Sequence, residues 1–98
     1  MPKIEEEIKT VLRVVEPTKY KVLLHNDDYT SMEFVVEILM EVFHKNVLES
    51  EQIMLNIHQK GRAICGIYTF EIAQTKVQQV KVMAKSSGFP LLATLEQE

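Results

Sequence analysis

The stretch that decides the fold is YKVLLHNDDYTSMEFV, from Tyr20 to Val35. It opens on a run of aromatic, β-branched and leucine side chains that is typical of a strand. The polar residues Asn26-Asp27-Asp28 end this run, and Thr30-Ser31-Met32-Glu33 then has the form of a capping box, which begins a helix by satisfying its first backbone N–H groups. The stretch therefore predicts a strand, a polar loop and a helix in direct succession.

Apolar periodicity predicts two helices in the first half of the chain. The first carries one apolar stripe at helical spacing, made of Met32, Val35, Val36, Leu39, Met40 and Phe43. A second helix is predicted from about Leu48 to Lys60, because Gly61 is a natural helix end. Its buried positions are expected to be Ile53, Met54 and Ile57.

The C-terminal half predicts a strand, a helix and a strand. Arg62 to Tyr68 has the composition of a strand, and Thr69 is expected to cap a helix from Phe70 to about Ser86. The inner stripe of that helix is predicted to be Ala73, Val77, Val80 and Ala84. Gly88 and Pro90 end it, and Leu91 to Leu95 supplies the last strand. The order β-α-α-β-α-β predicts a single α+β domain in which helices cover a three-stranded antiparallel sheet.

Length and composition narrow the class of protein. The chain of 98 residues is 46% hydrophobic, which is enough for one modest core. Its net charge of −3 argues against nucleic acid as a partner, because phosphate binding needs a basic surface. No apolar run is long enough to span a bilayer, and a single cysteine, Cys65, suits a reducing cytoplasm. We expect a cytoplasmic domain over residues 19–98, preceded over residues 1–18 by a flexible extension with apolar residues at helical spacing, namely Ile4, Ile8, Val11, Leu12 and Val15.

The loop Asn26-Asp27-Asp28 admits two interpretations. Asn and Asp favour turns, so a solvated connection is one of them. In the other, Thr30 or Ser31 already caps the helix, and the loop side chains are free to accept hydrogen bonds from a cation beside the apolar start of the helix. The spacing matches no calcium loop, and the acidic, glycine-free sequence matches no phosphate loop.

The remaining candidate residues do not indicate an enzyme. His58 lies at the end of the second predicted helix. We expect it to belong to a binding site only if that helix packs against the loop. Cys65 lies in the middle of a strand without a base beside it, so we expect it to be buried and inert. An Asp28–His58 acid–base pair would lack a nucleophile, a metal set or a cofactor loop. Metal binding by His25, Asp27, Asp28 and His58 is conceivable, but their spacing matches no zinc signature. We predict neither a metal nor a cofactor.

Several separated motifs lie in order between Tyr20 and Glu96. They are Asn26-Asp27-Asp28-Tyr29-Thr30, Met32-Glu33-Phe34-Val35, Met54, Ile57-His58, Gly61, Ala63-Ile64-Cys65-Gly66, Glu71, Thr75-Lys76-Val77, Pro90-Leu91-Leu92 and Thr94-Leu95-Glu96. With these motifs the chain resembles the ClpS adaptor proteins of the Clp AAA+ protease system. The resemblance implies a fold related to the C-terminal domain of the large-subunit ribosomal stalk protein, which agrees with the element order above.

The resemblance also implies a function. ClpS-like proteins are non-enzymatic adaptors for N-degrons, which are proteins whose first residue is a bulky Leu, Phe, Tyr or Trp, and they deliver these substrates to a Clp AAA+ unfoldase for degradation. By position, Asn26 and His58 would bind the free α-ammonium group, Asp28 would reach it through a water, and Asp27 would hold the neighbouring backbone. The pocket for the first side chain would be lined by Met32, Val35, Met54, Ile57 and Leu91.

The resemblance further implies a docking surface. Glu71, Thr75 and Lys76 would contact the N-terminal domain of a ClpA- or ClpC-like ATPase, and the extension would help to hand over the substrate from a monomeric adaptor. Two positions depart from the family pattern: Ser31 stands where proline is common, and Ile57 stands where valine is common. The added methylene of Ile57 is expected to bias the pocket against the largest rings.

The chemistry of an ammonium group agrees with these roles. It has three N–H donors and no acceptor, so its site must present acceptors, and an acetylated terminus should be rejected. Binding should weaken below about pH 6, where a histidine is ordinarily protonated. The alternative is a structural protein-interaction module with the same fold and no amine recognition.

Overall fold

Six elements of secondary structure follow one another in residues 17–98, the part of the chain that this computed structural model describes. In chain order they are β1 (Lys19–His25), α2 (Met32–Glu41), α3 (Val47–Lys60), β2 (Arg62–Thr69), α4 (Phe70–Ser87) and β3 (Leu92–Gln97). The predicted α+β class and the order β-α-α-β-α-β are therefore confirmed. The predicted extension, residues 1–18, lies almost wholly outside the described residues.

The three strands form one antiparallel sheet in the order β2-β1-β3, so β1 is the central strand. Leu23 of β1 stands opposite Ile64 on β2 and Thr94 on β3. On the β2 side the register shifts between Val22 and Leu23, which leaves Cys65 as the additional residue of a β-bulge. Because successive side chains point to opposite faces, Val22 lies on one face of the sheet and Leu23 on the other.

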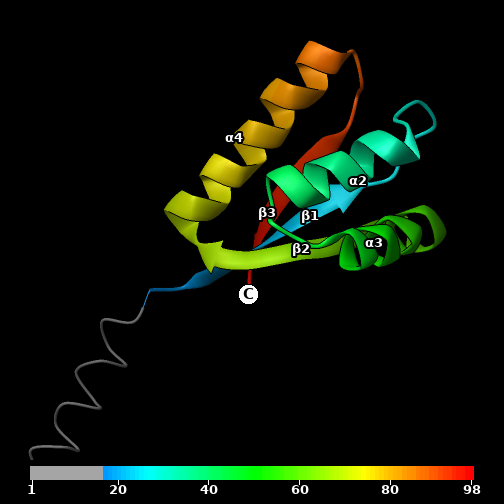
Figure 1. The fold of residues 1–98 in the computed structure, drawn as a ribbon. Helices are drawn as coiled ribbons and strands as arrows, with labels where there is room; N and C mark the ends of the chain where they lie inside the picture. The colour runs from blue at the N-terminus through cyan, green and yellow to red at the C-terminus, as the bar shows by residue number, and fades with distance from the viewer. Residues whose placement is uncertain (1–16) are drawn as a thin grey trace, which may run out of the picture.

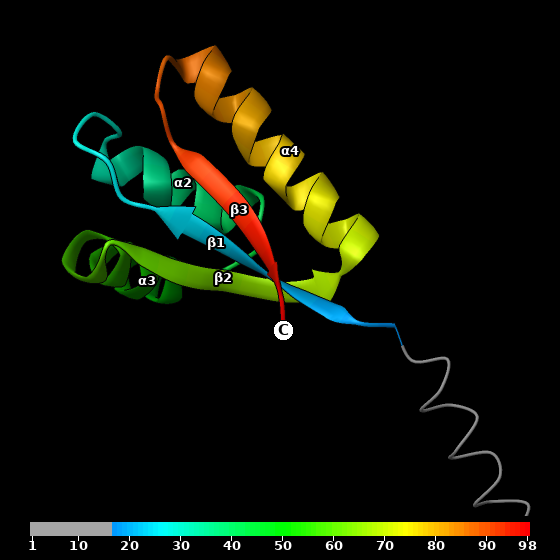
Figure 2. The ribbon, with the colours of Figure 1, turned by 180° about the vertical axis from the view of Figure 1, so that it is seen from behind.

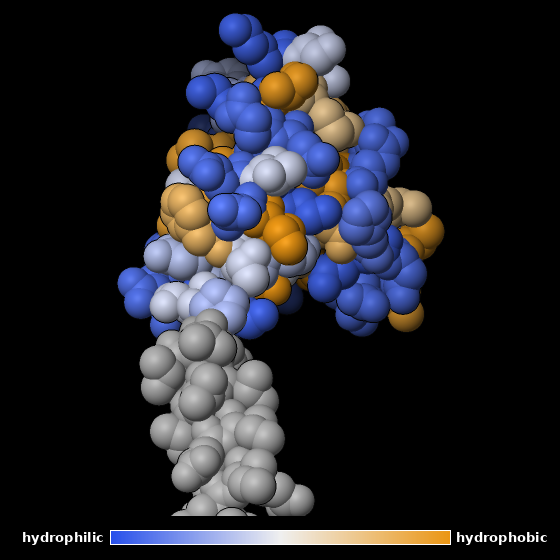
Figure 3. Space-filling model, turned by 90° about the vertical axis from the view of Figure 1, so that its left-hand side faces the viewer, coloured by the Kyte–Doolittle hydropathy of each residue, from blue (hydrophilic) through white to orange (hydrophobic). Residues whose placement is uncertain are grey.

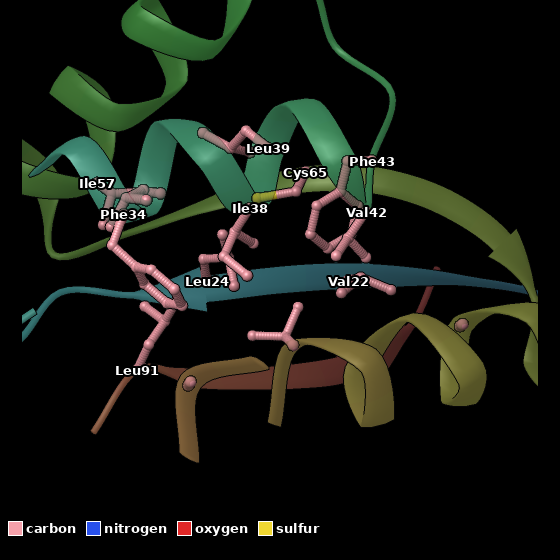
Figure 4. Close-up of a cluster of buried hydrophobic side chains, with 14 residues drawn as sticks. Val22, Leu24, Phe34, Ile38, Leu39, Val42, Phe43, Ile57, Cys65 and Leu91 are labelled. Atoms are coloured by element: carbon pink, nitrogen blue, oxygen red, sulfur yellow. The ribbon is translucent and has the colours of Figure 1, made fainter. Parts of the chain in front are cut away.

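The helices cover only one face of the described sheet. Figure 1 shows α2, α3 and α4 in front of the strands, and Figure 2 shows the strands in front of all three helices. The core lies between the two layers, and in Figure 4 the side chains of Val22 and Leu24 on β1 meet those of Ile38 on α2 and of Val42, which follows α2. Leu23, although only 5% exposed, is not part of this core because it points to the opposite face.

The buried face of the first helix overlaps the predicted stripe only in part: Val35, Leu39 and Phe43 are buried as predicted, but other members of the stripe are not. Within the helix, the buried residues are Phe34, Val35, Ile38 and Leu39. Met32 and Met40, which belong to the predicted stripe, are 47% and 38% exposed. Both sets recur at helical spacing, because apolar residues occupy most of this helix, and the pattern alone does not fix its rotation. Packing against the sheet selects the face that carries the larger, branched and aromatic side chains.

The other two helices follow their predicted stripes more closely. Ile57 in α3 and three predicted positions in α4 are buried, the latter being Ala73, Val80 and Ala84. Ile53, Met54 and Val77 are half-buried and pack against the edge of the core. Within residues 17–98, no helix is both long and apolar enough to cross a membrane.

Local signals set the ends of α3 and α4. Asn46 begins α3 by accepting a hydrogen bond from the Glu49 N–H at 2.8 Å. Gly61 ends α3 and Gly88 ends α4, both as predicted, in the left-handed conformation with φ of 90° and 79°, which other residues adopt at a cost. Thr69 is the N-cap residue of α4, as predicted, but its side chain makes no cap hydrogen bond.

Candidate functional site

A cavity of about 270 Å³ lies between the loop after β1, the start of α2 and the second half of α3. Its lining residues are Asn26, Asp27, Asp28, Thr30, Met32, Val35, Met54, Ile57 and His58. The structure thus brings together residues that the sequence separates by some thirty positions. All of the residues predicted for the ammonium group line this one cavity, and so do all of those predicted for the side-chain pocket except Leu91.

A backbone hydrogen bond joins the two halves of the cavity. The N–H of Asn26, just after β1, donates to the carbonyl of Gly61 at 2.8 Å. Gly61 is the residue that ends α3, and His58 lies three positions before it in the last turn of that helix. The bond therefore holds the end of α3, and with it His58, beside the loop. This is the packing on which the sequence interpretation of His58 depended.

Asp27 stabilises the loop from within. Its Oδ1 accepts hydrogen bonds from the N–H groups of Tyr29 at 2.8 Å and Thr30 at 2.7 Å, and its Oδ2 accepts the Thr30 hydroxyl at 2.7 Å. Partial burial raises the pKa of this carboxyl, but the hydrogen bonds from Thr30 and Tyr29 outweigh burial and hold the pKa below its usual value. The expectation that all three loop side chains lack a structural task is therefore wrong for Asp27.

The helix cap also differs in detail from the capping box. Ser31, and not Thr30, is the cap of α2, and its hydroxyl accepts a hydrogen bond from the Phe34 N–H at 3.1 Å. Thr30 uses its hydroxyl to donate to Asp27 instead. Thr30 also lines the cavity, a role that the sequence analysis missed. The only sequence feature that indicated this role is the position of Thr30 in the same short loop.

The other polar side chains of the cavity are available to a ligand. Asn26, Asp28 and His58 are exposed, and within residues 17–98 their side chains make no hydrogen bond. Asp28 offers carboxylate oxygens, Asn26 an amide oxygen, and a neutral histidine one ring nitrogen as acceptors. Together they form a group of acceptors at the polar side of the cavity.

The apolar side of the cavity has a firm floor and a more adaptable wall. Val35 and Ile57, both branched, are 6% and 2% exposed and belong to the core. Met32 is 47% exposed and Met54 is half-buried, so their flexible thioether side chains face the space above. A ligand that carries a cation next to a bulky apolar group matches this arrangement.

Leu91 lies elsewhere. It is 6% exposed, and Figure 4 shows it at the same end of the core as Phe34 and Ile57. Rather than the cavity, it lines a groove between α4 and the segment that leads into β3. Its predicted role as a pocket wall therefore stays a prediction.

The three predicted docking residues lie in the first two turns of α4. Glu71 and Thr75 are exposed, and the Thr75 hydroxyl donates to the Glu71 carbonyl at 3.0 Å. Lys76 is half-buried, and its Nζ donates to the carbonyl of Val42, at the end of α2, at 2.7 Å. The same Nζ lies 5.8 Å from the centre of the Tyr68 ring. Lys76 therefore ties α4 to α2, whereas the Glu71 carboxylate makes no hydrogen bond or ion pair within residues 17–98.

The surface around the start of α4 is mixed in character. Figure 3 views the molecule from the side on which α4 begins and shows hydrophobic patches scattered among hydrophilic residues. Phe70 and Ile72, which flank Glu71, are 44% and 49% exposed. Such a surface combines apolar area with a central carboxylate, which suits a protein partner.

Cys65 is not placed for nucleophilic chemistry. Burial raises the pKa of the Cys65 thiol from 9.0 to about 12, against smaller opposing effects of the Leu24 backbone and Lys45. The thiol is buried in the core, as predicted, and is not poised as a nucleophile. Within residues 17–98, no group of three or more His, Cys, Asp or Glu side chains is placed to hold a metal ion.

Comparison with known proteins gives one consistent result. Residues 15–94 match the family model of the ATP-dependent Clp protease adaptor protein ClpS. The chain is 54% identical over 93 residues to an ATP-dependent Clp protease adapter protein ClpS of Wolinella succinogenes, an alignment that covers 95% of this chain and 91% of that protein. It is 56% identical over 82 residues to the same adapter of Desulforapulum autotrophicum, covering 84% of this chain and 79% of the relative.

A solved structure is similar in fold as well as in sequence. Agrobacterium tumefaciens ClpS2, determined bound to L-phenylalaninamide, superimposes with a TM-score of 0.82 at 38% identity. The match covers 85% of this chain and all of that one.

Proposed function

This chain belongs to the ClpS family of Clp protease adaptors, which are not enzymes, and we propose that its cavity binds the N-terminal residue of N-degron substrates. The first residue would be Leu, Phe, Tyr or Trp. The observation that carries the proposal is the composition of the cavity, in which free acceptors stand beside an apolar floor. The first residue of a protein requires this combination, because its α-ammonium group and its side chain are bonded to the same carbon atom.

Three polar residues together bind the ammonium group. Its three N–H donors are matched by Asn26, His58 and, through a water, Asp28. Asp27 acts indirectly by holding the loop, since its oxygens already accept hydrogen bonds from Tyr29 and Thr30. The Thr30 hydroxyl, which lines the cavity, has its hydrogen directed to Asp27 and so adds no competing donor.

The apolar residues receive the first side chain. Val35 and Ile57 form the floor, and Met32 and Met54 adjust around aliphatic or aromatic groups. The Agrobacterium relative supports this role, because L-phenylalaninamide carries a free α-amino group and a benzyl side chain. Leu91 does not line the cavity, and we propose that it supports the pocket indirectly, through its place beside Phe34 in the core.

Delivery requires a second surface. We propose that Glu71 and Thr75, with Lys76 holding α4 in place, dock on the N-terminal domain of a ClpA- or ClpC-like ATPase. The adaptor would act as a cytoplasmic monomer, and residues 1–18 would assist in handing over the substrate. The cavity and the start of α4 are formed by different elements, so substrate and unfoldase can be bound together.

The decisive experiment is fluorescence anisotropy with labelled peptides that differ only in their first residue, which is Leu, Phe, Trp, Val or acetylated Leu. We expect tight binding of free Leu and Phe, weak binding of Val, and loss of binding on acetylation, because blocking the amine leaves acceptors unpaired at about 1–3 kcal/mol each. The affinity for Trp relative to Leu reports the effect of Ile57 on the depth of the pocket. If no peptide binds, or if acetylation changes nothing, the ammonium site is wrong and the interaction-module alternative takes its place.

A further inference from the structure

A groove of about 530 Å³ lies between the second half of α4 and residues 89–93, which lead into β3. Its floor is apolar. Ala84 and Leu91 are buried there, and three further apolar side chains are half-buried beside them, namely Val77, Phe89 and Ala93. The volume is in the range of sites that bind ligands, about 300–1,000 Å³. The groove and the cavity beside α3 are lined by different residues, so the proposed function leaves the groove unexplained.

One side of this groove is the outer edge of the sheet. Leu92 and Ala93, the first two residues of β3, line it. In the described part of the chain β3 pairs with β1 alone, because it stands at the end of the strand order β2-β1-β3. Every second residue of such an edge strand directs its backbone N–H and C=O away from the sheet, where they are able to pair with a further strand. Figures 1 and 2 both place α4 beside β3, on the side away from β1.

Two lysines border the groove. Lys81 and Lys85 are exposed, stand one helical turn apart on α4, and form no ion pair within residues 17–98. Like charges at this spacing repel each other and slightly destabilise the helix. The helix dipole offsets this cost for Lys85, which lies in the last turn, but not for Lys81. The groove is therefore positively charged, although the whole chain carries a net charge of −3.

We propose that this groove binds an extended segment of a protein partner, one with an apolar centre and carboxylates on both sides of that centre. The apolar side chains cover the floor, the carboxylates meet Lys81 and Lys85, and the backbone pairs with the outer edge of β3 as a fourth strand. Strand addition at a sheet edge is a recurring mode of peptide recognition, and an apolar centre with a polar rim is the usual anatomy of an interface. This inference is independent of the proposed ammonium site.

The test uses the full chain with labelled alanine methyl groups and NMR spectroscopy. Among the alanines, Ala84 and Ala93 line the groove, whereas Ala63 lines a separate hollow of about 340 Å³ that also contains lysines. The probe is a peptide of eight residues with four central valines and two glutamates at each end. Its ends are acetylated and amidated, so it has no α-ammonium group for the cavity. We expect the peptide to shift the signals of Ala84 and Ala93 and to leave that of Ala63 in place.

Matched variants test the charge and the backbone separately. Lys81→Gln with Lys85→Gln should weaken peptide binding by about 2- to 30-fold, because two exposed ion pairs are lost. Lys19→Gln with Lys60→Gln, which changes two exposed lysines elsewhere, should leave it unchanged. Replacing the glutamates of the peptide by lysines should abolish binding. Replacing its two middle valines by prolines should weaken binding strongly, because proline has no N–H to donate to the edge of β3.

Each contrary outcome overturns the proposal. Unmoved signals of Ala84 and Ala93 would show that the groove does not bind such a segment, and a shift of Ala63 alone would place the peptide in the other hollow. Equal binding of the lysine peptide would exclude charge complementarity, and equal binding of the proline peptide would exclude strand addition. Groove signals that depend on protein concentration without peptide would assign the groove to a second copy of the chain.

Discussion

The cavity beside α3 and the surface at the start of α4 are the places of the two proposed functions, and they are built in different ways. The cavity takes its side chains from a loop and two helices, whereas the proposed docking residues come from two turns of one helix. In each region one charged side chain is already engaged, Asp27 within its own loop and Lys76 with the carbonyl of Val42. Among residues 17–98, the Asp28 and Glu71 carboxylates have no such partner. A charged residue in a predicted site can thus support the site without contacting the ligand.

The largest expected effect is the loss of acceptors from the cavity. Asp28→Ala and His58→Ala should each weaken binding of a Leu-initiated peptide by about 1–3 kcal/mol, or about 5- to 150-fold, because an ammonium donor then loses its partner. Glu71→Gln is the control and should leave peptide affinity unchanged. The measurement is fluorescence anisotropy, with thermal unfolding to confirm that the exposed substitutions leave the domain folded.

The pH dependence of binding separates the two cavity residues. Acidification should weaken native binding, because an imidazole that takes up a proton loses its acceptor nitrogen and gains a charge that repels the ammonium group. The His58→Ala variant should lose this part of the pH dependence, and Asp28→Ala should keep it. Native affinity that is constant down to pH 5 would remove His58 as an acceptor.

A smaller effect, on stability, distinguishes Lys76 from its neighbour Glu71. Lys76→Met removes a charge-assisted hydrogen bond to the end of α2, so the free energy of unfolding should fall by about 1–2 kcal/mol. Lys81→Met, an exposed lysine on the same helix, and Glu71→Gln should change it little. The measurement is urea denaturation. Equal stability of all three variants would show that Lys76 is free to bind a partner directly.

The smallest effect concerns the loop that Asp27 holds. Thr30→Val removes the hydroxyl donor to Asp27 and should lower stability by about 1 kcal/mol at pH 7, while Thr75→Val serves as a matched control within α4. Because the folded-state pKa of Asp27 is lowered, the unfolded chain takes up the proton first as the pH falls. The difference between native and Thr30→Val protein should therefore be present above about pH 4 and disappear below it. A difference that persists at pH 2 would mean that the charge of Asp27 is irrelevant.

The sequence by itself determined the elements and most of their ends. Gly61 and Gly88 end their helices as predicted, because a left-handed residue after a helix is a local preference that does not depend on distant contacts. The polar loop was also recognisable, since Asn26 and its neighbours interrupt an apolar strand. Neighbouring residues in the chain carry all of this information.

Tertiary structure decided how these elements meet. The rotation of α2 could not be deduced, because two apolar stripes compete on one helix and only the sheet selects between them. The sequence did not show that Asp27 and Lys76 are engaged internally, since the Lys76 bond spans 34 positions and depends on α4 packing beside α2. The cavity lies where the loop after β1 and the start of α2 meet α3, and the hydrogen bond from the Asn26 N–H to the Gly61 carbonyl is one of the contacts made there. Contacts between residues far apart in sequence depend on the packing of whole elements, which local patterns do not encode.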